Sequence, residues 1–533
     1  MREESPSRKI IYPRWWNFVL FLLFVCALVA SNWAAVNTIN YEVGDLAANS
    51  LLIQDAKSLR LLTGHYSRLG FNHPGPAILY VLASGELVFY DWLNIVKSPF
   101  SGQLVAVAFY NAIWMVLLFR LIYKTTKSIP SSVLAISVFF VAAALFDYQF
   151  FAGIWFPHMY FFPFSVLIIS SSRLANGNSD SFQSLALSAG FLINGHASFV
   201  AIIGIIFLIV LVFNHQIFKT NKHNRYLFSK SYFKENKNSI FTFSLTLFLF
   251  FVPLLLETVN NYPGPIASYA DYSGEHEANT ILEAIGFIGA YWGGIAPLFL
   301  GILVMCLIFS PKFESSEFAK DAISMLMVFF AATFALLLYA MYGADLLDQK
   351  YIGLFYHSIP ALTISLTFMC VYQMINISQK KNLALGLSCL CLLGVYVQIN
   401  KAPTYTLQYN QPGIVDLYDS LSALNSEGRL VLDLDNTNDW QFVWYNIAGL
   451  QVYSKRNKKE LLCINKNWHI LFTKPSICTP DEILTGRRFI VRKTAKNDSP
   501  RVPPAIESQG LSFYESSTFQ VEPITPSISD EDS

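Results

Sequence analysis

Charged side chains are scarce in this chain. Asp, Glu, Lys and Arg together make up 14% of its 533 residues, whereas 53% of the residues are hydrophobic. Soluble globular domains carry about 25% charged residues, so the composition excludes a soluble protein as the overall class. The hydrophobic residues form long continuous runs, unlike the short alternating strands of a transmembrane barrel. The sequence therefore predicts a polytopic helical membrane protein.

The sequence also lacks the common signatures of soluble enzymes. It contains no P-loop, glycine-rich dinucleotide turn, nucleophile elbow, zinc-site spacing or internal repeat. These absences remove the sequence signals for nucleotide-dependent chemistry and for a zinc site. The net charge is only +1, and we expect no nucleic-acid partner.

What the sequence has instead is long apolar segments. A helix needs about 20 mainly apolar residues to cross the hydrocarbon core, and the chain offers about eleven such segments. The first is too long for a signal-peptide core and lacks a small-residue cleavage site, so we expect it to be retained. The predicted spans are 15–36, 103–123, 131–147, 154–172, 182–195, 197–214, 239–256, 284–309, 321–342, 352–377 and 383–399.

Basic residues are distributed unevenly between the two sides that these spans define. If residues 1–14 are cytoplasmic, eighteen lysines and arginines fall on the cytoplasmic side and five in the outer loops, as the positive-inside rule requires. Residues 76–94 are apolar too, but Glu86 and Asp91 interrupt them. Because counting them as a span would move later basic loops outside, we expect an interfacial helix there, within an outer loop over 37–102.

The last part of the chain changes composition. Residues 400–500 are polar, with the strand-like stretches "RLVLDLD", "WHILFTK" and "RRFIVRK" and a helical stretch near 440–450. An odd number of spans places this part outside. The predicted fold is thus an all-α polytopic membrane domain, residues 15–399, followed by a small extracytoplasmic α/β domain and a disordered tail over 501–533. Cys463 and Cys478 are either a disulfide, which we favour, or free thiols.

Asp45 is the first functional candidate. It lies at the start of a stretch of good helix formers just past the first span. The simpler interpretation is a helix N-cap, because Asp accepts hydrogen bonds from free backbone N–H groups. A carboxylate at the membrane surface can also act as a general base toward an acceptor hydroxyl.

The stretch "LLTGHYSRLGFNHPGPAILY", residues 61–80, is unusually polar and rigid. Its two prolines exclude a helix over 72–75 and indicate a fixed turn. Arg68 and His73 can be ordinary interfacial anchors, or they can form a cationic site for a lipid-linked phosphate. Both interpretations stay open, and His65, Tyr66 and Asn72 are neighbouring candidates for substrate contacts.

Three further outer segments carry ionisable groups. Asp147 either marks the interface or acts together with His158, and His196 is either a buried structural histidine or a substrate contact. The third segment, 257–280, is rich in glycine and proline, so a solvated acidic loop is a better interpretation than a metal site. Its candidate ligands are Asp271, Glu275, His276 and Glu277.

Taken together, this arrangement resembles the GT-C superfamily of integral-membrane glycosyltransferases, which includes protein O-mannosyltransferases and lipid A aminoarabinose transferases. The motifs that carry the resemblance are "GDLAANSLLI", "GHYSRLGFNHPGP", "WFPHMYFFPF" and "LINGHASF". The resemblance implies a catalytic acid at Asp45 and a second acidic residue at Asp147. It also places a phosphate-binding position at His73, where lysine is usual in the family.

The function implied by the resemblance is inverting transfer of a sugar from a polyprenyl-phosphate carrier to a glycan, lipid or protein acceptor. This reaction would take place on the outer face of a bacterial cytoplasmic (inner) membrane. Asp45 would deprotonate the acceptor, and Arg68, His73 and Lys350 would stabilise the departing phosphate. No cofactor is required by this scheme, and a divalent cation stays open. Two alternatives also stay open, a transporter or flippase for a lipid-linked saccharide and a non-catalytic scaffold of the same fold.

Overall fold

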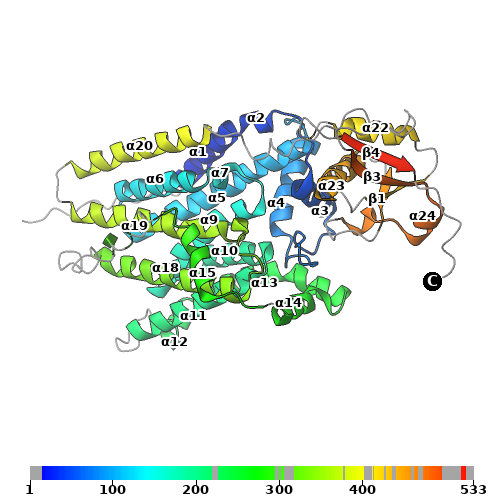
Figure 1. The fold of residues 1–533 in the computed structure, drawn as a ribbon. Helices are drawn as coiled ribbons and strands as arrows, with labels where there is room; N and C mark the ends of the chain where they lie inside the picture. Colours follow the sequence, from blue (N-terminus) through cyan, green and yellow to red (C-terminus); the bar gives the residue numbers. More distant parts are fainter. Residues whose placement is uncertain are drawn as a thin grey trace, which may run out of the picture.

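The computed structural model describes residues 15–218, 226–275, 277–294, 299, 301, 303–304, 317–375, 379–400, 411, 413–424, 428–434, 440–457, 461–465, 472–494 and 518–523. The predicted cytoplasmic residues 1–14 and His276 lie outside this set. In Figure 1 the long helices run side by side in one bundle, and a smaller mixed domain from the end of the chain sits at one end of it.

The bundle draws its helices from residues 15 to 400. They are α1 (Trp15–Ser31), α5 (Pro99–Thr126), α6 (Ile129–Phe146), α9 (Phe161–Ala175), α10 (Phe182–Gly195), α11 (Ser198–Phe218), α13 (Lys237–Asn260), α15 (Ile281–Ala290), α18 (Glu317–Tyr342), α19 (Ser358–Met374) and α20 (Lys380–Asn400). Shorter helices connect them: α7 (Gln149–Ala152), α8 (Phe156–Met159), η2 (Ser179–Ser181), α12 (Lys230–Glu235), α14 (Gly264–Glu275) and η3 (Lys350–His357).

Local sequence signals set the start of two central helices. Ser98 caps α5 by accepting a hydrogen bond from the backbone N–H of Ser101, and Ser128 caps α6 in the same way toward Ser131. In both helices a proline occupies the first turn, where its missing N–H costs nothing and its fixed φ suits the helix.

The eleven predicted spans each contain a helix, but not all of these helices are long enough to cross a bilayer. Among the described residues, seven helices meet the length and composition required: α5, α6, α11, α13, α18, η3 continuing into α19, and α20. Helices α1 and α15 are apolar but shorter. With 15 and 14 residues, α9 and α10 extend about 22 and 21 Å, less than the hydrocarbon core of about 30 Å. The number of eleven crossings is therefore not established.

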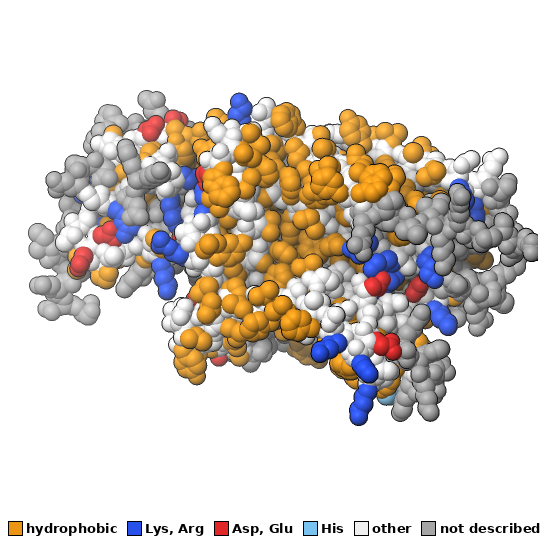
Figure 2. Space-filling view, turned by 180° about the vertical axis from the view of Figure 1, so that it is seen from behind, with side chains coloured by type: hydrophobic (Ala, Val, Ile, Leu, Met, Phe, Trp, Pro, Cys, Tyr) orange, Lys and Arg blue, Asp and Glu red, His pale blue; other side chains and the backbone are white. Residues whose placement is uncertain are grey.

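The surface agrees with a membrane location. Figure 2 shows hydrophobic side chains covering the middle of the molecule, whereas Lys, Arg, Asp and Glu gather toward its two ends. Exposed large apolar residues are frequent on α11, α13 and α20. A continuous apolar band of this kind is the face that lipid tails cover, and the chain is a multi-pass membrane protein.

Three connections predicted for one side of the membrane meet at one end of the bundle. Lys124 at the end of α5 and Arg173 at the end of α9 pair with Asp180 at 2.7 and 2.9 Å. Asn176 donates a hydrogen bond to Asp321 of α18 at 2.7 Å. The ends of α5 and α9 and the start of α18 thus lie close together. Which end is cytoplasmic stays a prediction.

The segment 37–102, predicted as the outer loop and called so below, contains three helices. They are α3 (Gly44–Lys57), α4 (Ala77–Gly85) and the π-helix η1 (Glu86–Trp92), and the short helix α2 (Trp33–Val36) ends just before the segment. The 76–94 segment is thus helical as predicted. Glu86, which interrupts its apolar run, is completely buried and ion-paired with Lys57 at 3.0 Å.

The C-terminal domain is built on a four-stranded sheet in the order β2-β1-β3-β4. Strand β1 (Leu430–Leu434) pairs in parallel with β2 (Leu462–Ile464) and β3 (Arg488–Thr494), and β4 (Thr518–Pro523) pairs antiparallel with β3. Helix α23 (Trp440–Arg456) packs against the three parallel strands and against α22 (Ile414–Leu424). Two short helices complete the domain, η4 (Lys474–Ser476) and α24 (Pro480–Thr485).

Two sequence expectations for this domain need correction. Residues 518–523 form strand β4 within the segment 501–533 that was expected to be disordered, because β3 offers them a backbone ladder that composition does not reveal. The second strand is Leu462–Ile464, ahead of the predicted stretch 468–474, of which the described residues 472–474 are not in a strand.

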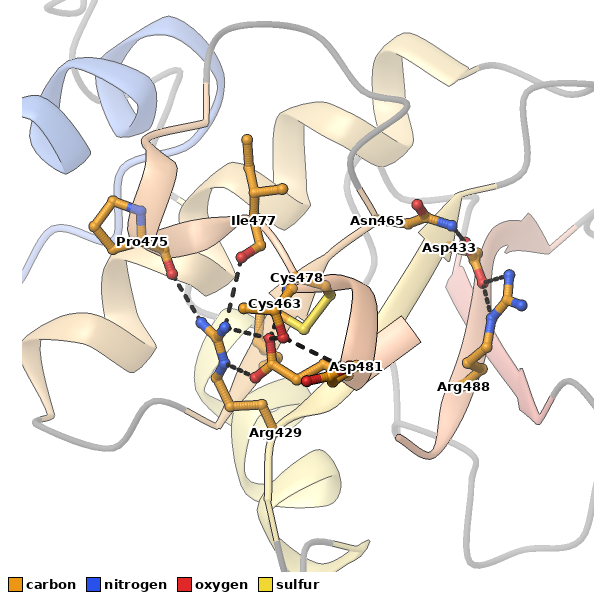
Figure 3. Close-up of a disulfide and its surroundings, with 12 residues drawn as sticks. Arg429, Asp433, Cys463, Asn465, Pro475, Ile477, Cys478, Asp481 and Arg488 are labelled. Atoms are coloured by element: carbon orange, nitrogen blue, oxygen red, sulfur yellow. Dashed lines mark hydrogen bonds and ion pairs between the residues drawn. A yellow bond between two sulfur atoms is a disulfide. The ribbon is translucent and has the colours of Figure 1, made fainter. Parts of the chain in front are cut away.

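A disulfide ties this domain together. Cys463 in β2 is bonded to Cys478, with the two Cα atoms 4.9 Å apart. Figure 3 shows the bond beside Arg429, whose guanidinium pairs with Glu482 at 2.6 Å. Of the two alternatives for Cys463 and Cys478, the structure therefore contains the disulfide and not the free thiols.

Candidate active site

A cavity of about 610 Å³ lies at the end of the bundle that carries the outer loop 37–102. Its walls come from the outer loop, the connections after α7 and α10, helices α8, α11, α14 and α18, and η3. Six sequence candidates line it: Asp45, His65, Tyr66, Arg68, His73 and His196. The volume lies within the range of about 300–1,000 Å³ typical of small-molecule sites.

Asp45 lies in the first turn of α3, but it is not the cap of this helix. The N-cap is Val43, without a side-chain cap hydrogen bond. Gly44 enters the helix with φ +58, a left-handed conformation that glycine adopts without steric cost. The simpler of the two interpretations of Asp45, a capping residue, is therefore wrong, because Val43 is the N-cap and the Asp45 carboxylate, which lines the cavity, accepts from the side chains of Tyr66 and Trp155.

Two neutral donors hold the Asp45 carboxylate. The Tyr66 hydroxyl donates to Oδ1, and the Trp155 indole N–H donates to Oδ2 at 3.2 Å. Burial, followed by the adjacent Asp45 charge, raises the pKa of the Tyr66 phenol, so the phenol keeps the proton that it donates.

The stretch 64–73 forms a tight two-stranded turn that presents its side chains to the cavity. Backbone hydrogen bonds join Gly64 to His73 and His73 to His65. The following Gly75 donates its backbone N–H to the carbonyl of Asn194 at 3.0 Å, and a Cβ on Gly75 would lie 2.1 Å from the Asn194 side chain. The "HPGP" sequence is therefore rigid, as predicted, and it docks on the turn that carries His196.

Three histidines stack on one wall of the cavity. The His65 and His73 ring centroids are 4.3 Å apart, and those of His73 and His196 are 4.2 Å apart. The backbone N–H of Ala197 donates to His73 Nδ1 at 3.5 Å, which places the proton of the neutral ring on Nε2.

Burial lowers the pKa of all three histidines. The pKa values of His65 and His73 fall well below the ordinary value, and that of His196 falls to about 4. The stack is therefore uncharged near neutral pH. His73 is available as a neutral hydrogen-bond donor rather than as a cation.

Arg68 lies at the cavity and is ion-paired. Its Nη2 contacts Oδ1 of Asp345 at 2.5 Å, and both side chains are partly exposed. Asp345 also lines the cavity, but nothing in the local sequence signals this role. Lys350, the other predicted phosphate ligand, is exposed and does not appear among the lining residues, although its neighbour Tyr351 does.

The remaining candidates, Asp147, His158 and Asn72, are not among the residues that line the cavity. Asp147 pairs with His158 at 3.0 Å, and neither residue lines the cavity. Their link to it is Trp155, whose ring centroid lies 5.6 Å from that of His158. The backbone carbonyl of Asn72 accepts a hydrogen bond at 2.6 Å from the hydroxyl of Tyr269 in α14, which itself lines the cavity.

A divalent cation has no evident protein ligand set. Within the described part of the chain, no group of three or more His, Cys, Asp or Glu side chains is placed to hold a metal ion. The two oxygens of Asp45 are already engaged by donors that cannot ligate a cation in that role. We therefore derive no step through a metal.

Comparisons with known proteins find structures with a similar fold, but no match at the level of sequence. No protein-family model matches the sequence, and no curated protein matches it. Among solved structures, ArnT from Cupriavidus metallidurans bound to undecaprenyl phosphate is similar with a TM-score of 0.54 and 10% identity, over 90% of this chain and 93% of that one. The oligosaccharyltransferase of Archaeoglobus fulgidus aligns with a TM-score of 0.46 and 11% identity, over 89% of this chain and 67% of that one.

Proposed function

We propose that this membrane protein, whose fold is that of the GT-C superfamily, is a glycosyltransferase that uses a polyprenyl-phosphate sugar as donor. The structural match to ArnT with undecaprenyl phosphate bound supports a lipid-linked donor. We place the reaction on the outer face of the bacterial cytoplasmic membrane, where the positive-inside distribution puts the cavity. The acceptor is a glycan, lipid or protein hydroxyl.

The observation that carries the proposal is the fixed carboxylate of Asp45 in the same cavity as the guanidinium of Arg68. Two neutral donors, Tyr66 and Trp155, hold the carboxylate in one orientation. A positioned carboxylate is suited to take a proton, and a guanidinium is suited to hold a phosphate. The cavity thus offers one group that can deprotonate the acceptor, Asp45, and one that can stabilise the departing phosphate, Arg68.

In the proposed mechanism the acceptor hydroxyl donates a hydrogen bond to Asp45. As the acceptor oxygen attacks the anomeric carbon, its proton passes to the carboxylate, and the bond between that carbon and the phosphate oxygen breaks. The polyprenyl phosphate leaves with the electron pair, and Arg68 stabilises the added negative charge. Because attack and departure take place on opposite faces of the sugar, the anomeric configuration is inverted.

The three stacked histidines contact the sugar in this scheme. Neutral imidazole rings offer one N–H each and cost less to bury than cations. Their nearness to aromatic residues such as Phe156, 4.3 Å from His65 between centroids, gives a surface on which a sugar ring can rest. His73 then acts as a donor to a hydroxyl or a phosphate oxygen without adding charge.

Asp147 and His158 take an indirect role in this proposal. Their hydrogen bond supports the segment that carries Trp155, and Trp155 orients Asp45. Lys350 remains a candidate for a second phosphate contact, because its side chain is exposed beside the cavity residue Tyr351.

The direct test is Asp45→Asn. This change keeps the size of the side chain and removes the base, so transfer should fall about 10²- to 10⁴-fold, the usual contribution of a positioned general base. The measurement is the turnover of purified protein in liposomes with undecaprenyl-phosphate sugars and membrane-derived acceptors. Transfer at the wild-type rate by Asp45→Asn would refute the assignment of the base.

A matched control lies on the same helix. Asp55→Asn changes the same residue type near the other end of α3, where Asp55 pairs with Lys455 at 3.0 Å outside the cavity, and should leave turnover within twofold of the wild type. The sugar and the acceptor are found by comparing glycolipids and surface glycans of cells with and without the protein. An unchanged profile in cells lacking the protein would argue against a transferase.

A further inference from the structure

Helix α3 belongs to two hydrophobic cores at once. Leu46, Ile53 and Ala56 are buried in the core of the bundle. On the same helix, Ala47, Ala48 and Leu51 are buried in the core of the C-terminal domain, together with residues of α22, α23 and the sheet. In Figure 1 α3 lies between the bundle and that domain, with α23 beside it. The two parts therefore share the helix that carries Asp45.

The closest contacts occur at the start of α3. A Cβ added to Gly44 would lie 2.2 Å from the ring of Tyr445 in α23, so this ring rests directly on the residue before Asp45. One turn further along α23, a Cβ on Gly449 would lie 2.7 Å from the carbonyl oxygen of Glu42. The backbone of α23 thus presses against the segment that leads into the helix.

Charge reinforces this contact. Arg456, in the last turn of α23, pairs with Glu42 at 2.5 Å and with Glu86 of η1 at 3.3 Å. Both glutamate side chains are 1% exposed. One guanidinium therefore joins the residues before α3 to the neighbouring helix of the outer loop, and a fork of fixed geometry can satisfy both carboxylates at once.

Glu86 stays ionised in this environment. Burial raises the pKa of the Glu86 carboxyl, but Arg456 and Lys57, together with hydrogen bonds from two glutamines, lower it further, to about 2. Burial likewise lowers the pKa of Arg456, and its two carboxylate partners more than reverse this. The arrangement holds full charges in place, so its geometry is specified more tightly than apolar contact alone would specify it.

We propose that Arg456 and Tyr445 of the C-terminal domain are positioning residues for Asp45, which they hold through the segment that leads into α3. The proposal rests on the proposed transferase function. A domain that only stabilised the protein would not need to place an aromatic ring and a bridging guanidinium on the three residues that precede Asp45.

The test compares Arg456→Lys with Lys455→Met. Arg456→Lys keeps the charge but loses the fork that reaches both glutamates, so kcat should fall at least tenfold while the KM for the undecaprenyl-phosphate sugar changes less than twofold. Lys455→Met breaks the pair with Asp55, which lies near the other end of α3 from Asp45. This variant should keep kcat within twofold. A kcat of Arg456→Lys within twofold of the wild type overturns the proposal.

A second readout separates this proposal from the proposed function. Amide hydrogen exchange over residues 44–48 should become at least tenfold faster in Arg456→Lys, with no change in α5. If the wild type shows no transfer, the transferase function fails, and exchange alone decides the coupling between α23 and α3. Unchanged exchange over 44–48 overturns the proposal.

A third variant covers the case in which Arg456→Lys fails to fold. Glu42→Gln with Arg456→Gln removes the buried charges of one pair together, and Glu86 keeps Lys57 as its partner. This double variant should fold, lower kcat at least tenfold and loosen residues 44–48. Wild-type kcat in the folded double variant overturns the proposal.

Discussion

At the scale of single residues, the pair formed by Arg68 and Asp345 controls the charge of the cavity. Within the described part of the chain, Nη2 of Arg68 pairs with Oδ1 of Asp345 at 2.5 Å, and both side chains keep part of their surface. A donor phosphate would compete with the Asp345 carboxylate for the same guanidinium. Asp345 therefore weakens the binding of an anion at the position where the proposed function requires one.

Replacing Asp345 with Asn should tighten the binding of undecaprenyl phosphate. Partly exposed ion pairs contribute about 0.2–1 kcal/mol, so the expected fall in Kd is about 1.4- to fivefold, with a larger rise in Kd for Arg68→Gln. Titration of the protein in nanodiscs measures both. Asp348→Asn, three residues away and exposed, should leave Kd unchanged. Weaker binding by Asp345→Asn would mean that Asp345 orients Arg68 for the phosphate instead of competing with it.

At the scale of elements, the sequence of α3 predicts the helix itself, but contacts with distant parts of the chain determine how the helix begins. The residue composition of 44–57 correctly predicts the helix. It also suggested Asp45 as the cap, which is wrong, because Tyr66 and Trp155 compete for the carboxylate from 21 and 110 positions away. Gly44 allows this entry by its φ of +58 and by leaving room for Tyr445.

Gly44→Ala should therefore destabilise the protein strongly. A non-glycine residue in a sparsely populated backbone region costs about 1–3 kcal/mol, and the clash with Tyr445 adds to this. Thermal unfolding in detergent measures the loss. Gly386→Ala in α20, where a Cβ meets no atom within 4 Å, should be neutral or slightly stabilising. Adding Tyr445→Ala to Gly44→Ala should recover part of the loss, and no recovery would show that backbone strain alone is responsible.

At the scale of the whole molecule, the histidine stack joins two distant parts of the chain. His65 and His73 come from the outer loop and His196 from the turn between α10 and α11. Their lowered pKa values mean that the folded state binds fewer protons than the unfolded chain between the unfolded value, about 6.5, and the folded value, about 4 for His196. The stabilisation is complete above pH 6.5 and is lost as the pH falls toward 4.

The melting temperature should thus be nearly constant from pH 7 to 8 and fall between pH 6.5 and 4, and the affinity for undecaprenyl phosphate should not rise as the pH drops from 8 to 6. Thermal unfolding and binding titrations across this range check the two statements. The variant His73→Gln should reduce the acid sensitivity of unfolding. A rise in phosphate affinity as the pH drops from 8 to 6 would instead show that a histidine becomes a cation within the working range.

The sequence by itself determined the elements of this protein and their approximate places. Apolar runs predicted the helices, the distribution of basic residues predicted which loops share a side, and the polar, proline-containing stretch 61–80 was recognised as a rigid part of the outer loop. These properties depend on composition and on neighbours along the chain, because helix formation and membrane insertion are decided over about 20 residues.

Only the tertiary structure decided which side chains meet. The contacts of Asp45 with Trp155, of Arg68 with Asp345 and of Arg456 with Glu42 and Glu86 join positions 110 to 414 residues apart. No local pattern encodes them, since the helices between these positions can pack in many orders with the same hydrophobic periodicity. The sequence supplied the groups of the candidate site, and the packing of the outer loop against both the bundle and the C-terminal domain brought them to one cavity.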